Sequence, residues 1–398
     1  MGEKMKTLRI GVIGMGWMGH AHSRSWLALS QFYPELHLRA RLVACADTDA
    51  ARRADAKARY GFSKVYADWR DLIAAGEIDA LSITAPNFLH LQMIEAAAKA
   101  GMHIYCEKPA GKNANETRRA ALCAKRAGVL SAVGYNYRFA PMVQYCRKLL
   151  DGGHFGEVEQ LDCRFLSMYG SDPMGRLSWR YDKNYAGAGA GGDMLSHAAD
   201  MAVFLAGGIA EVSAHRRLFI AKRPLPPGEK DNKGEGETHF AAGKESDPKG
   251  AVTNEDYIGA LVKFDNGAAG FLESSRVARG PKCEMAFALY GRRGSARWNF
   301  EKMNELQLYL PNGKAANDGY ASLLAGSAHP QHSRFNPGDG IGAGFEDLKK
   351  MEAAKFAADI KNGKQQQSGL QQAASAAEVV AAALRSCQNG TWQKTRQT

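Results

Sequence analysis

Two pairs of ionisable residues have the types and spacing that proton transfer beside a charged oxygen requires. Glu107 and Lys108 end the apolar run HIYC and stand directly before Pro109. Because proline restricts the preceding residue to extended geometry, the Lys108 side chain starts from a fixed backbone. Asp193 and His197 lie four residues apart, so on a helix they share one face. We expect the lysine to stabilise negative charge and the histidine to accept or donate a proton near neutral pH.

Each pair also has a purely structural interpretation. Glu107 and Lys108 can be a surface ion pair, although a Lys-Pro step at the end of a buried strand argues against it. Asp193 can be a helix cap and His197 a hydrogen-bonded core residue. The glycines of AGAGAGG before Asp193 favour the functional interpretation, because they leave the backbone open to a ligand.

The segment GVIGMGWMGHAH carries Gly14, Gly16 and Gly19 in the G-x-G-x-x-G pattern. The pattern follows a predicted strand and opens a predicted helix, as binding of a dinucleotide pyrophosphate requires. Glycines in an ordinary turn are the alternative. The residues of this turn expected to bind the cofactor are Gly14, Met15, Gly16, Trp17 and Met18.

Asp47 ends the second predicted strand, where a carboxylate would accept hydrogen bonds from the adenosine ribose. It lies 33 residues after Gly14, because SQFYPELHLRAR lengthens the connection. A phosphate about 4 Å from this carboxylate would be repelled by about 4 kcal/mol at an effective dielectric constant of about 20, which favours NAD over NADP. Arg52 and Arg53 would reduce that preference.

The segment TAPNFLH follows the strand expected across the topological switch point of the sheet. We expect Thr84, Pro86, Asn87 and His90 to line the cofactor crevice there. A helix start with a turn proline and a capping asparagine explains the same residues. Glu107 and Lys108 are expected to bind the cofactor as well, with Glu107 as a hydrogen-bond partner for Lys108 or the cofactor.

The pattern of apolar runs predicts an α/β Rossmann domain over residues 1–136, followed by an α+β domain over residues 137–398. Apolar strands at 8–14, 41–47, 79–86, 103–108 and 130–136 alternate with helical segments, which predicts a parallel sheet. Alternating segments at 158–170, 210–221, 256–264, 268–278, 283–291, 295–300 and 306–310 predict a large, mostly antiparallel sheet. We assign helices 192–205, 345–361 and 370–387 to the second domain. We expect a mobile loop at 221–250 and a second long loop at 325–344. Each loop is either a lid over a cleft or a surface excursion.

Composition bounds the class of protein. With 398 residues, 45% of them hydrophobic and 23% charged, the chain is a soluble two-domain protein without an apolar run long enough for a membrane span. Its seven cysteines occur singly, which predicts buried thiols in the cytoplasm and no metal site. The net charge of +11 comes from scattered residues, so we expect anionic small molecules rather than nucleic acid as partners.

These motifs together resemble the Gfo/Idh/MocA oxidoreductases, a family of NAD(P)-dependent sugar and cyclitol dehydrogenases. The resemblance covers the glycine pattern, TAPNFLH, the Glu107-Lys108-Pro109 signature, GYNYR at 134–138, WR at 179–180 and the helix with Asp193 and His197. It implies that Lys108, Asp193 and His197 are the catalytic set and that the antiparallel sheet assembles a homodimer or homotetramer. The WR and GYNYR motifs add Trp179, Arg180 and Asn136 as cofactor-binding residues and Tyr135 as a substrate-binding residue.

Within this family the chain looks most like the branch of levoglucosan and inositol dehydrogenases. The expected reaction is oxidation of a secondary hydroxyl of a sugar, anhydrosugar or cyclitol to a ketone with NAD. Asp193 would orient His197, His197 would take the hydroxyl proton, and Lys108 would stabilise the alkoxide. A redox-assisted glycosidase and a non-catalytic NAD-binding regulator are the alternatives. Leu195 stands where the family often has glycine, so the pocket there is expected to differ in shape.

Overall fold

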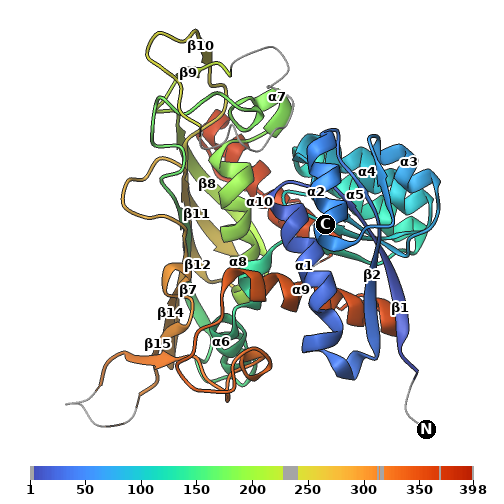
Figure 1. Ribbon diagram of the computed structural model, residues 1–398. Helices are drawn as coiled ribbons and strands as arrows, with labels where there is room; N and C mark the ends of the chain where they lie inside the picture. Colours follow the sequence, from blue (N-terminus) through green and yellow to red (C-terminus); the bar gives the residue numbers. More distant parts are fainter. Residues whose placement is uncertain (1–3, 227–240, 312, 314–317, 367–368, 397–398) are drawn as a thin grey trace. The chain divides into compact units, whose positions relative to one another are not determined.

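The structure is a computed structural model that describes residues 4–226, 241–311, 313, 318–366 and 369–396. These residues form two compact units. The first unit contains the chain up to Asn136 and returns to include Phe345–Ala374, and the second contains Tyr137–Gly344 and the chain from Ser375 onward. In Figure 1 the chain is coloured by residue number, from blue at the N-terminus to red at the C-terminus. Each unit is described by itself below.

The first unit is built on a parallel sheet of six strands in the order β3-β2-β1-β4-β5-β6. The strands are β1 (Lys6–Ile13), β2 (Leu38–Ala46), β3 (Lys64–Tyr66), β4 (Ala80–Ile83), β5 (His103–Cys106) and β6 (Ser131–Val133). The strand order reverses between β1 and β4, which is the doubly wound topology predicted from the sequence. Five strands were predicted, and the three-residue strand β3 was missed because it is too short to show a pattern.

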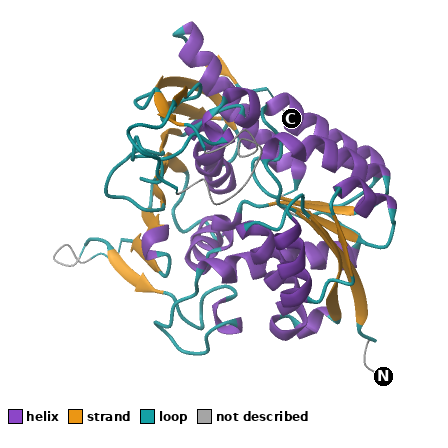
Figure 2. Ribbon diagram, turned by 45° about the horizontal axis from the view of Figure 1, so that its top comes forward, coloured by secondary structure: helices purple, strands orange, loops and turns teal. Residues whose placement is uncertain are grey.

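Helices lie above and below this sheet in Figure 2. They are α1 (Trp17–Phe32), α2 (Ala50–Tyr60), α3 (Trp69–Ala74), α4 (His90–Lys99), α5 (Ala114–Ala127) and α9 (Phe345–Asn362), with short 3₁₀ turns at Pro34–Leu36 and Asn87–Leu89. Local sequence sets their ends: Asp49 accepts hydrogen bonds from the first amides of α2, and Asn113 does so for α5. Gly128 ends α5 in the left-handed conformation, with φ of 68°.

Helix α9 belongs to the first unit, whereas the sequence assigned this segment to the second domain. Phe356 packs against Trp26 of α1 and Tyr105 of β5, with ring centroids 6.3 and 5.9 Å apart. Arg24 of α1 donates to Glu346 at 2.8 Å through its Nε. The assignment was wrong because an amphipathic pattern shows which face of a helix is buried, not which element buries it.

The second unit is built on a mixed sheet of nine strands in the order β16-β15-β14-β13-β7-β12-β11-β8-β17. The strands are β7 (Val158–Leu166), β8 (Ile209–Arg217), β11 (Tyr257–Phe264), β12 (Ala269–Ser275), β13 (Glu284–Gly291), β14 (Gly294–Asn299), β15 (Glu305–Tyr309), β16 (Ala321–Leu324) and β17 (Gln393–Lys394). Among the described strand pairs of this sheet, β12 and β7 are the only parallel pair. All seven predicted strands are present, and the predicted fold class is confirmed.

One face of the nine-stranded sheet is buried under helices of the same unit. Along β7 the side chains of Leu161, Cys163 and Phe165 point inward and alternate with more exposed neighbours. The helices of this unit are α6 (Pro141–Asp151), α7 (Lys183–Ala186), α8 (Ser196–Ala206) and α10 (Leu370–Asn389), and α10 joins the unit from Ser375 onward. Figure 1 shows α8 and α10 alongside the sheet, and Ser386 of α10 accepts a hydrogen bond from the backbone of Ala214.

The two predicted loops differ in what the structure describes. Residues 227–240 of the first loop lie outside the described part of the chain, but its ends pair as β9 (Lys222–Pro224) and β10 (Lys249–Ala251). The second loop is hydrogen-bonded both to the rest of the unit and within itself. Asn304, just before β15, bonds the backbone of Ala343 in both directions, and the buried His332 has Nε2 2.7 Å from the Ile341 carbonyl oxygen. The second loop is therefore a packed surface excursion.

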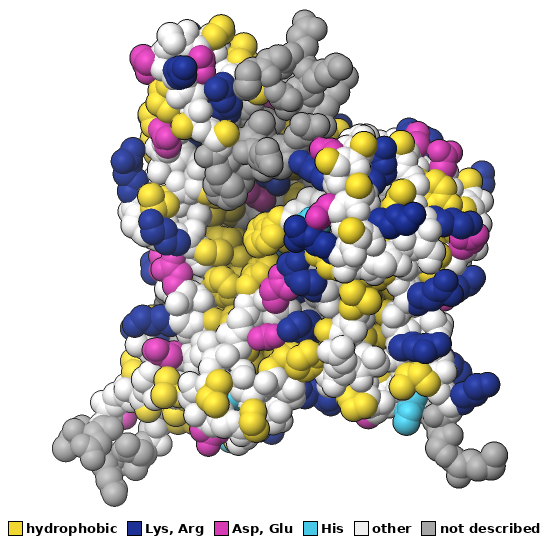
Figure 3. All heavy atoms as spheres, in the orientation of Figure 1, with side chains coloured by type: hydrophobic (Ala, Val, Ile, Leu, Met, Phe, Trp, Pro, Cys, Tyr) yellow, Lys and Arg dark blue, Asp and Glu magenta, His cyan; other side chains and the backbone are white. Residues whose placement is uncertain are grey.

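The surface mixes charges of both signs. Figure 3 shows Lys and Arg side chains interspersed with Asp and Glu over the face in view. In the described residues, no helix is both long enough and apolar enough to cross a membrane. All seven cysteines are free, and four of them are buried.

Candidate functional site

The glycine turn after β1 is built by close backbone approach. Gly14 has a φ of +88°, and a Cβ there would lie 2.8 Å from the Ala85 nitrogen. A Cβ at Gly19 would lie 2.1 Å from the Gly14 carbonyl oxygen, so only glycine lets α1 pack this close to the turn. The hydroxyl of Thr84 donates to the Gly14 carbonyl oxygen at 2.6 Å, which ties the turn to the end of β4.

The start of α1 leaves space and hydrogen-bond donors for an anion. A Cβ placed on Gly16 would meet nothing within 4 Å. Gly16 caps α1 without a side-chain hydrogen bond, and the first turn contains no acidic residue. The first amides of a helix point outward and carry partial positive charge. These features fit the pyrophosphate of a dinucleotide, which needs close backbone contact and donors.

The neighbouring turn residues face different surroundings. The Met15 side chain is only 1% exposed and packs into the core, so only its backbone can face a ligand. Trp17 is 69% exposed and stacks on Phe345 of α9, with ring centroids 5.4 Å apart. Met18 is half-buried. Of the three predicted side chains in this turn, Trp17 is thus the most accessible.

Asp47 stands directly after β2 and is half-buried. Its Oδ2 accepts from the Met15 backbone N–H at 2.7 Å and its Oδ1 from that of Asp49 at 2.9 Å. Each carboxylate oxygen has a further lone pair for another donor. Arg53 donates to the Asp47 and Thr48 carbonyl oxygens, while Arg52 lies 3.8 Å from the Asp49 carboxylate. Neither arginine is paired with the Asp47 carboxylate, so the charge argument for NAD over NADP keeps its basis.

His90 is placed as a connector of two loops. Its Nδ1 lies 2.9 Å from the Pro109 carbonyl oxygen and its Nε2 lies 2.7 Å from that of Ala85. The ring is buried, and this burial lowers its pKa. Since both ring nitrogens face backbone carbonyls, we interpret His90 as holding the loops after β4 and β5 together. Pro86 precedes the 3₁₀ turn in extended geometry, and Asn87 is buried in that turn.

Lys108 follows β5 directly and is half-buried. Its backbone N–H donates to Oε2 of Glu107 at 3.3 Å. The Glu107 side chain is buried, and its Oε1 lies 2.6 Å from Lys349 Nζ and 3.0 Å from His22 Nε2. Burial alone would raise the pKa of Glu107, but Lys349 and His22 hold it well below its usual range. Glu107 was expected to bind Lys108 or the cofactor. In the structure its carboxylate also binds Lys349 and His22, which were not predicted from the sequence.

Tyr135 and Asn136 follow β6, and both are buried. The side-chain nitrogen of Asn136 is buried without a hydrogen-bond partner among the described residues. A buried donor of this kind is costly unless a ligand or water accepts from it. The carboxyl ends of parallel strands meet at one edge of a sheet, so β1, β2, β4, β5 and β6 bring all the predicted residues of this unit to that edge.

In the second unit Asp193 lies in a π-helical turn (Gly191–Leu195) that leads into α8, which carries His197. Such turns are frequent at functional sites. The hydroxyl of Tyr169 donates to Asp193 Oδ2 at 2.9 Å. His197 is buried, and its ring lies 4.8 Å from that of Tyr137 and 5.5 Å from that of Phe165. Leu195 is fully buried.

Tyr169 was not among the residues predicted from the sequence. It lies 24 residues before Asp193, just beyond the end of β7, and no motif marks it. The only signal was its position at the end of a predicted strand, where side chains of neighbouring elements meet.

Trp179 and Arg180 lie in a 3₁₀ turn (Trp179–Tyr181), with the guanidinium 4.4 Å from the Trp179 ring centre. The next residue, Tyr181, is held between Arg223 and Arg276, whose guanidinium carbons lie 4.2 and 4.4 Å from its ring centre. These cation–π contacts to Tyr181 hold the 3₁₀ turn in place. The residues described here contain no group of three or more metal-binding side chains.

The sheet order, the glycine turn and the uncapped start of α1 define a dinucleotide-binding protein of the Rossmann class. A family model described as "Oxidoreductase family, NAD-binding Rossmann fold" matches residues 8–135, and the GFO/IDH/MocA C-terminal domain model matches residues 143–297. The chain belongs to the Gfo/Idh/MocA oxidoreductase family and carries its NAD-binding domain.

Several proteins similar to this chain are named dehydrogenases. The chain is 34% identical over 362 residues to levoglucosan dehydrogenase of Pseudarthrobacter phenanthrenivorans, with 90% of each chain covered. It is 26% identical over 272 residues to myo-inositol 2-dehydrogenase of Thermotoga maritima, covering 68% of this chain and 69% of that protein. A solved structure of levoglucosan dehydrogenase in complex with NADH and levoglucosan matches with a TM-score of 0.91 at 30% identity, covering 99% of this chain and 100% of that chain.

Proposed function

We propose that this protein is an NAD-dependent dehydrogenase that oxidises a secondary hydroxyl of an anhydrosugar, a sugar or a cyclitol to a ketone. The observation that carries the proposal is the position of Lys108 directly after β5. At that edge of the sheet it joins the open turn at Gly16 and the Asp47 carboxylate. A fixed ammonium beside a dinucleotide site is suited to an alcohol whose oxygen becomes negative during oxidation.

The chain's own residues divide the work on the substrate hydroxyl. Lys108 stabilises negative charge on the substrate oxygen, and His197 accepts the hydroxyl proton. Asp193, itself held by Tyr169, orients the imidazole. The bound nicotinamide supplies the acceptor for the hydride that leaves carbon as the C=O bond forms. That Lys108 and His197 act on the same hydroxyl is part of the proposal.

Gly14, Gly16, Asp47, Thr84 and Asn136 are the residues we propose to hold the dinucleotide. The glycines admit the pyrophosphate, and Asp47 accepts from the adenosine ribose. Thr84 shapes the turn through its bond to the Gly14 carbonyl, and Asn136 offers its buried side-chain amide. The substrate class is inferred from the levoglucosan and myo-inositol dehydrogenases that this chain resembles.

The test is a substrate panel with the purified full-length protein. Levoglucosan, glucose, myo-inositol and a chromogenic glycoside are each incubated with NAD or NADP, and the absorbance of reduced nicotinamide is followed. We expect reduction of NAD, faster than of NADP, with at least one of the unsubstituted polyols. Release of the chromophore without net reduced cofactor would select redox-assisted glycoside cleavage instead, and cofactor binding without any turnover would select a regulator.

Lys108→Ala is the first variant to make. We expect its kcat to fall by about a hundredfold or more, the scale typical of a lost catalytic group, while NAD binding is retained. Turnover near that of the wild type in this variant would refute the assigned chemistry. NAD affinity is measured separately by fluorescence titration, so that loss of binding and loss of chemistry are distinguished.

We also propose a homodimer or homotetramer formed through the nine-stranded sheet, in the cytoplasm. Leu261 on β11 is 55% exposed, and its paired neighbours are Phe271 on β12 and Ser213 on β8. Seven free cysteines fit a reducing compartment. Light scattering in solution tests the assembly, and a mass equal to one chain at micromolar concentration would reject it.

A further inference from the structure

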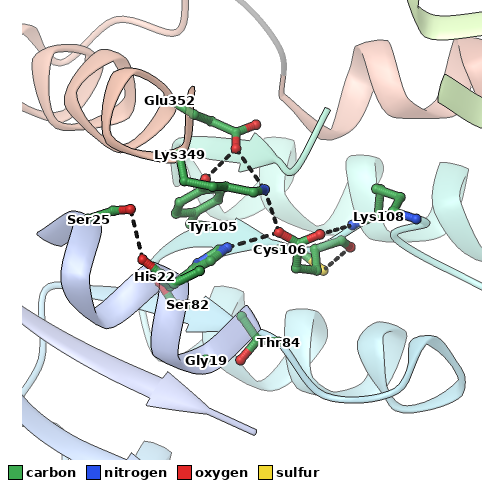
Figure 4. A network of polar contacts seen from close by, with 12 residues as sticks. Gly19, His22, Ser25, Ser82, Thr84, Tyr105, Cys106, Lys108, Lys349 and Glu352 are labelled. Atoms are coloured by element: carbon green, nitrogen blue, oxygen red, sulfur yellow. Dashed lines mark hydrogen bonds and ion pairs between the residues drawn. The ribbon is translucent and has the colours of Figure 1, made fainter. Parts of the chain in front are cut away.

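A buried cluster of ionisable side chains lies beside Lys108 in the first unit (Figure 4). His22 comes from α1, Tyr105 and Glu107 come from β5 and the residue after it, and Lys349 and Glu352 come from α9. Lys349 and Glu352 are each only 1% exposed. Sequence positions more than 240 residues apart therefore meet in one polar network inside the domain.

The cluster is centred on the Lys349 ammonium. Its Nζ donates to Glu107 Oε1 at 2.6 Å and to Glu352 Oε2 at 3.0 Å. Tyr105 donates its hydroxyl to the same oxygen of Glu352 at 2.5 Å. Burial lowers the pKa of His22, which leaves a neutral ring whose Nε2–H can donate to Glu107. Glu107 is thus the carboxylate on which donors from α1 and α9 converge.

The Glu107 carboxylate packs directly against the backbone after β6. A Cβ on Gly134, just after β6, would lie 2.6 Å from Glu107 Oε1, so the carboxylate fills the space that this glycine leaves. Its second oxygen accepts the Lys108 backbone N–H. The same carboxylate therefore couples the Lys349 ammonium to the backbone of the residue that carries the proposed catalytic amine.

Stability alone gives a weak reason for this arrangement. Replacing a buried ion pair by apolar side chains of similar volume is often neutral or stabilising, because desolvation offsets the attraction. The presence of the buried network around Lys349 is therefore better explained by the side chains that it holds in position. Here it lies next to Lys108, whereas the apolar contacts of Phe356 with Trp26 and Tyr105 already attach α9 to the unit.

We propose that Lys349 is a positioning residue for Lys108: it holds the Glu107 carboxylate, which receives the Lys108 backbone N–H and keeps the catalytic side chain in place. The inference rests on the proposed function, because it assumes that Lys108 acts on the substrate. Without Lys349, Glu107 would be left as a buried carboxylate with one neutral imidazole, and would take up a proton, bind water or turn away from its present contacts.

The test compares Lys349→Met with Lys349→Arg and with the control Lys350→Met. Lys350 lies on the same helix but pairs with Asp347 and is partly exposed. We expect Lys349→Met to lower kcat about tenfold or more while the KM for NAD changes less than about threefold, because positioning of the amine is lost but the glycine turn is intact. Lys349→Arg should recover part of kcat, and Lys350→Met should match the wild type.

A readout independent of turnover is the NMR signal of isotopically methylated Lys108, assigned by its disappearance in Lys108→Ala. We expect this signal to move in Lys349→Met and to stay unchanged in Lys350→Met. An unchanged signal together with wild-type kcat in Lys349→Met would overturn the inference and leave the proposed function standing. Wild-type turnover in Lys108→Ala would instead overturn the proposed function.

If Lys349→Met does not fold, the double variant Lys349→Met with Glu107→Gln removes both charges. We expect this double variant to fold, because the charge of Glu107 is removed together with that of Lys349 and Glu352 keeps the hydrogen bond from Tyr105, yet to keep the low kcat. Recovery of wild-type kcat in the double variant would show that Lys349 only neutralised a charge, and would overturn the positioning role.

Discussion

Tyr169 controls how the Asp193 carboxylate is presented. Its hydroxyl donates to Oδ2, which fixes the plane of the carboxylate and leaves Oδ1 for other partners. Burial and the neighbouring Asp193 charge raise the pKa of Tyr169 well above its usual range. The phenol therefore stays protonated, and remains a donor, at neutral pH.

Tyr169→Phe is expected to lower kcat about tenfold with little change in the KM for NAD, because it removes only the group that holds Asp193. The unfolding free energy should fall by about 1 kcal/mol, the usual worth of one hydrogen bond. Steady-state kinetics and thermal unfolding measure the two effects. Tyr309→Phe, which loses a hydrogen bond to the exposed Asp318, is the control. A loss of stability with unchanged kcat would show that Tyr169 is only structural.

At the scale of single residues, the sequence predicted what local geometry determines. The glycine turn follows from the need for close backbone approach, because a Cβ at Gly14 or Gly19 would collide with neighbouring backbone atoms. His90 and Glu107 were expected to face the cofactor, but their polar atoms are held by Pro109, Ala85, Lys349 and His22. Partners so distant along the chain leave no local pattern.

At the scale of elements, long apolar runs predicted the strands well, and the short β3 escaped because three residues define no periodicity. The placement of α9 could not be predicted, because its buried face contains Lys349 and Glu352, which in a sequence indicate an exposed surface. That face fits the interior because the Tyr105 hydroxyl of β5 binds Glu352 and the carboxylate of Glu107, the next residue after β5, binds Lys349.

Helix α9 also makes folding stability depend on pH. Burial raises the pKa of Glu352 from 4.5 to about 7, since Lys349 offsets only part of the cost and Glu107 adds repulsion. A carboxyl with a raised folded-state pKa is fully stabilising below its unfolded value, and the advantage is lost as pH rises to about 7. Besides Lys349 and Glu107, Tyr105 is a titratable group that faces Glu352.

Glu352→Gln is therefore expected to gain stability relative to the wild type as pH rises from about 4.5 to about 7, by up to about 3 kcal/mol. Above about pH 7 the difference should be constant, because Glu352 is then ionised in both folded and unfolded chains. Urea unfolding of both proteins across this range measures the difference. Parallel stability curves would mean that Glu352 does not titrate in this window.

At the scale of the whole molecule, the first unit is assembled from two separate parts of the chain. The segment after α9 contributes as well: Gln365 bonds both the N–H and the carbonyl of Ser131 on β6, at 2.8 and 2.7 Å. The sequence predicted a domain boundary at residue 136. That residues 1–136 bind the dinucleotide and residues 137–398 bind the substrate stays a prediction. The contact of Phe345–Ala374 with the first unit shows that residues 1–136 do not contain its full core.

A fragment of residues 1–136 is expected to unfold without cooperativity, because it exposes the apolar surface of Trp26 and Tyr105 and leaves Glu107 without Lys349. Joining residues 345–374 to it through a flexible linker should restore a cooperative transition and NAD binding. Circular dichroism during heating and fluorescence titration measure these. Equal transition temperatures with and without the added segment would show that α9 is dispensable.

The return of α9 to the first unit sets an order of events on the ribosome. Strands β1 to β6 and helices α1 to α5 emerge early in synthesis, but α9 emerges only after strands β7 to β16 of the second unit have been translated. Until α9 has been made, Trp26 of α1 and Tyr105 of β5 lack their packing partner Phe356. Cotranslational folding of this protein is therefore not strictly vectorial, and its first half has a particular need for chaperone protection.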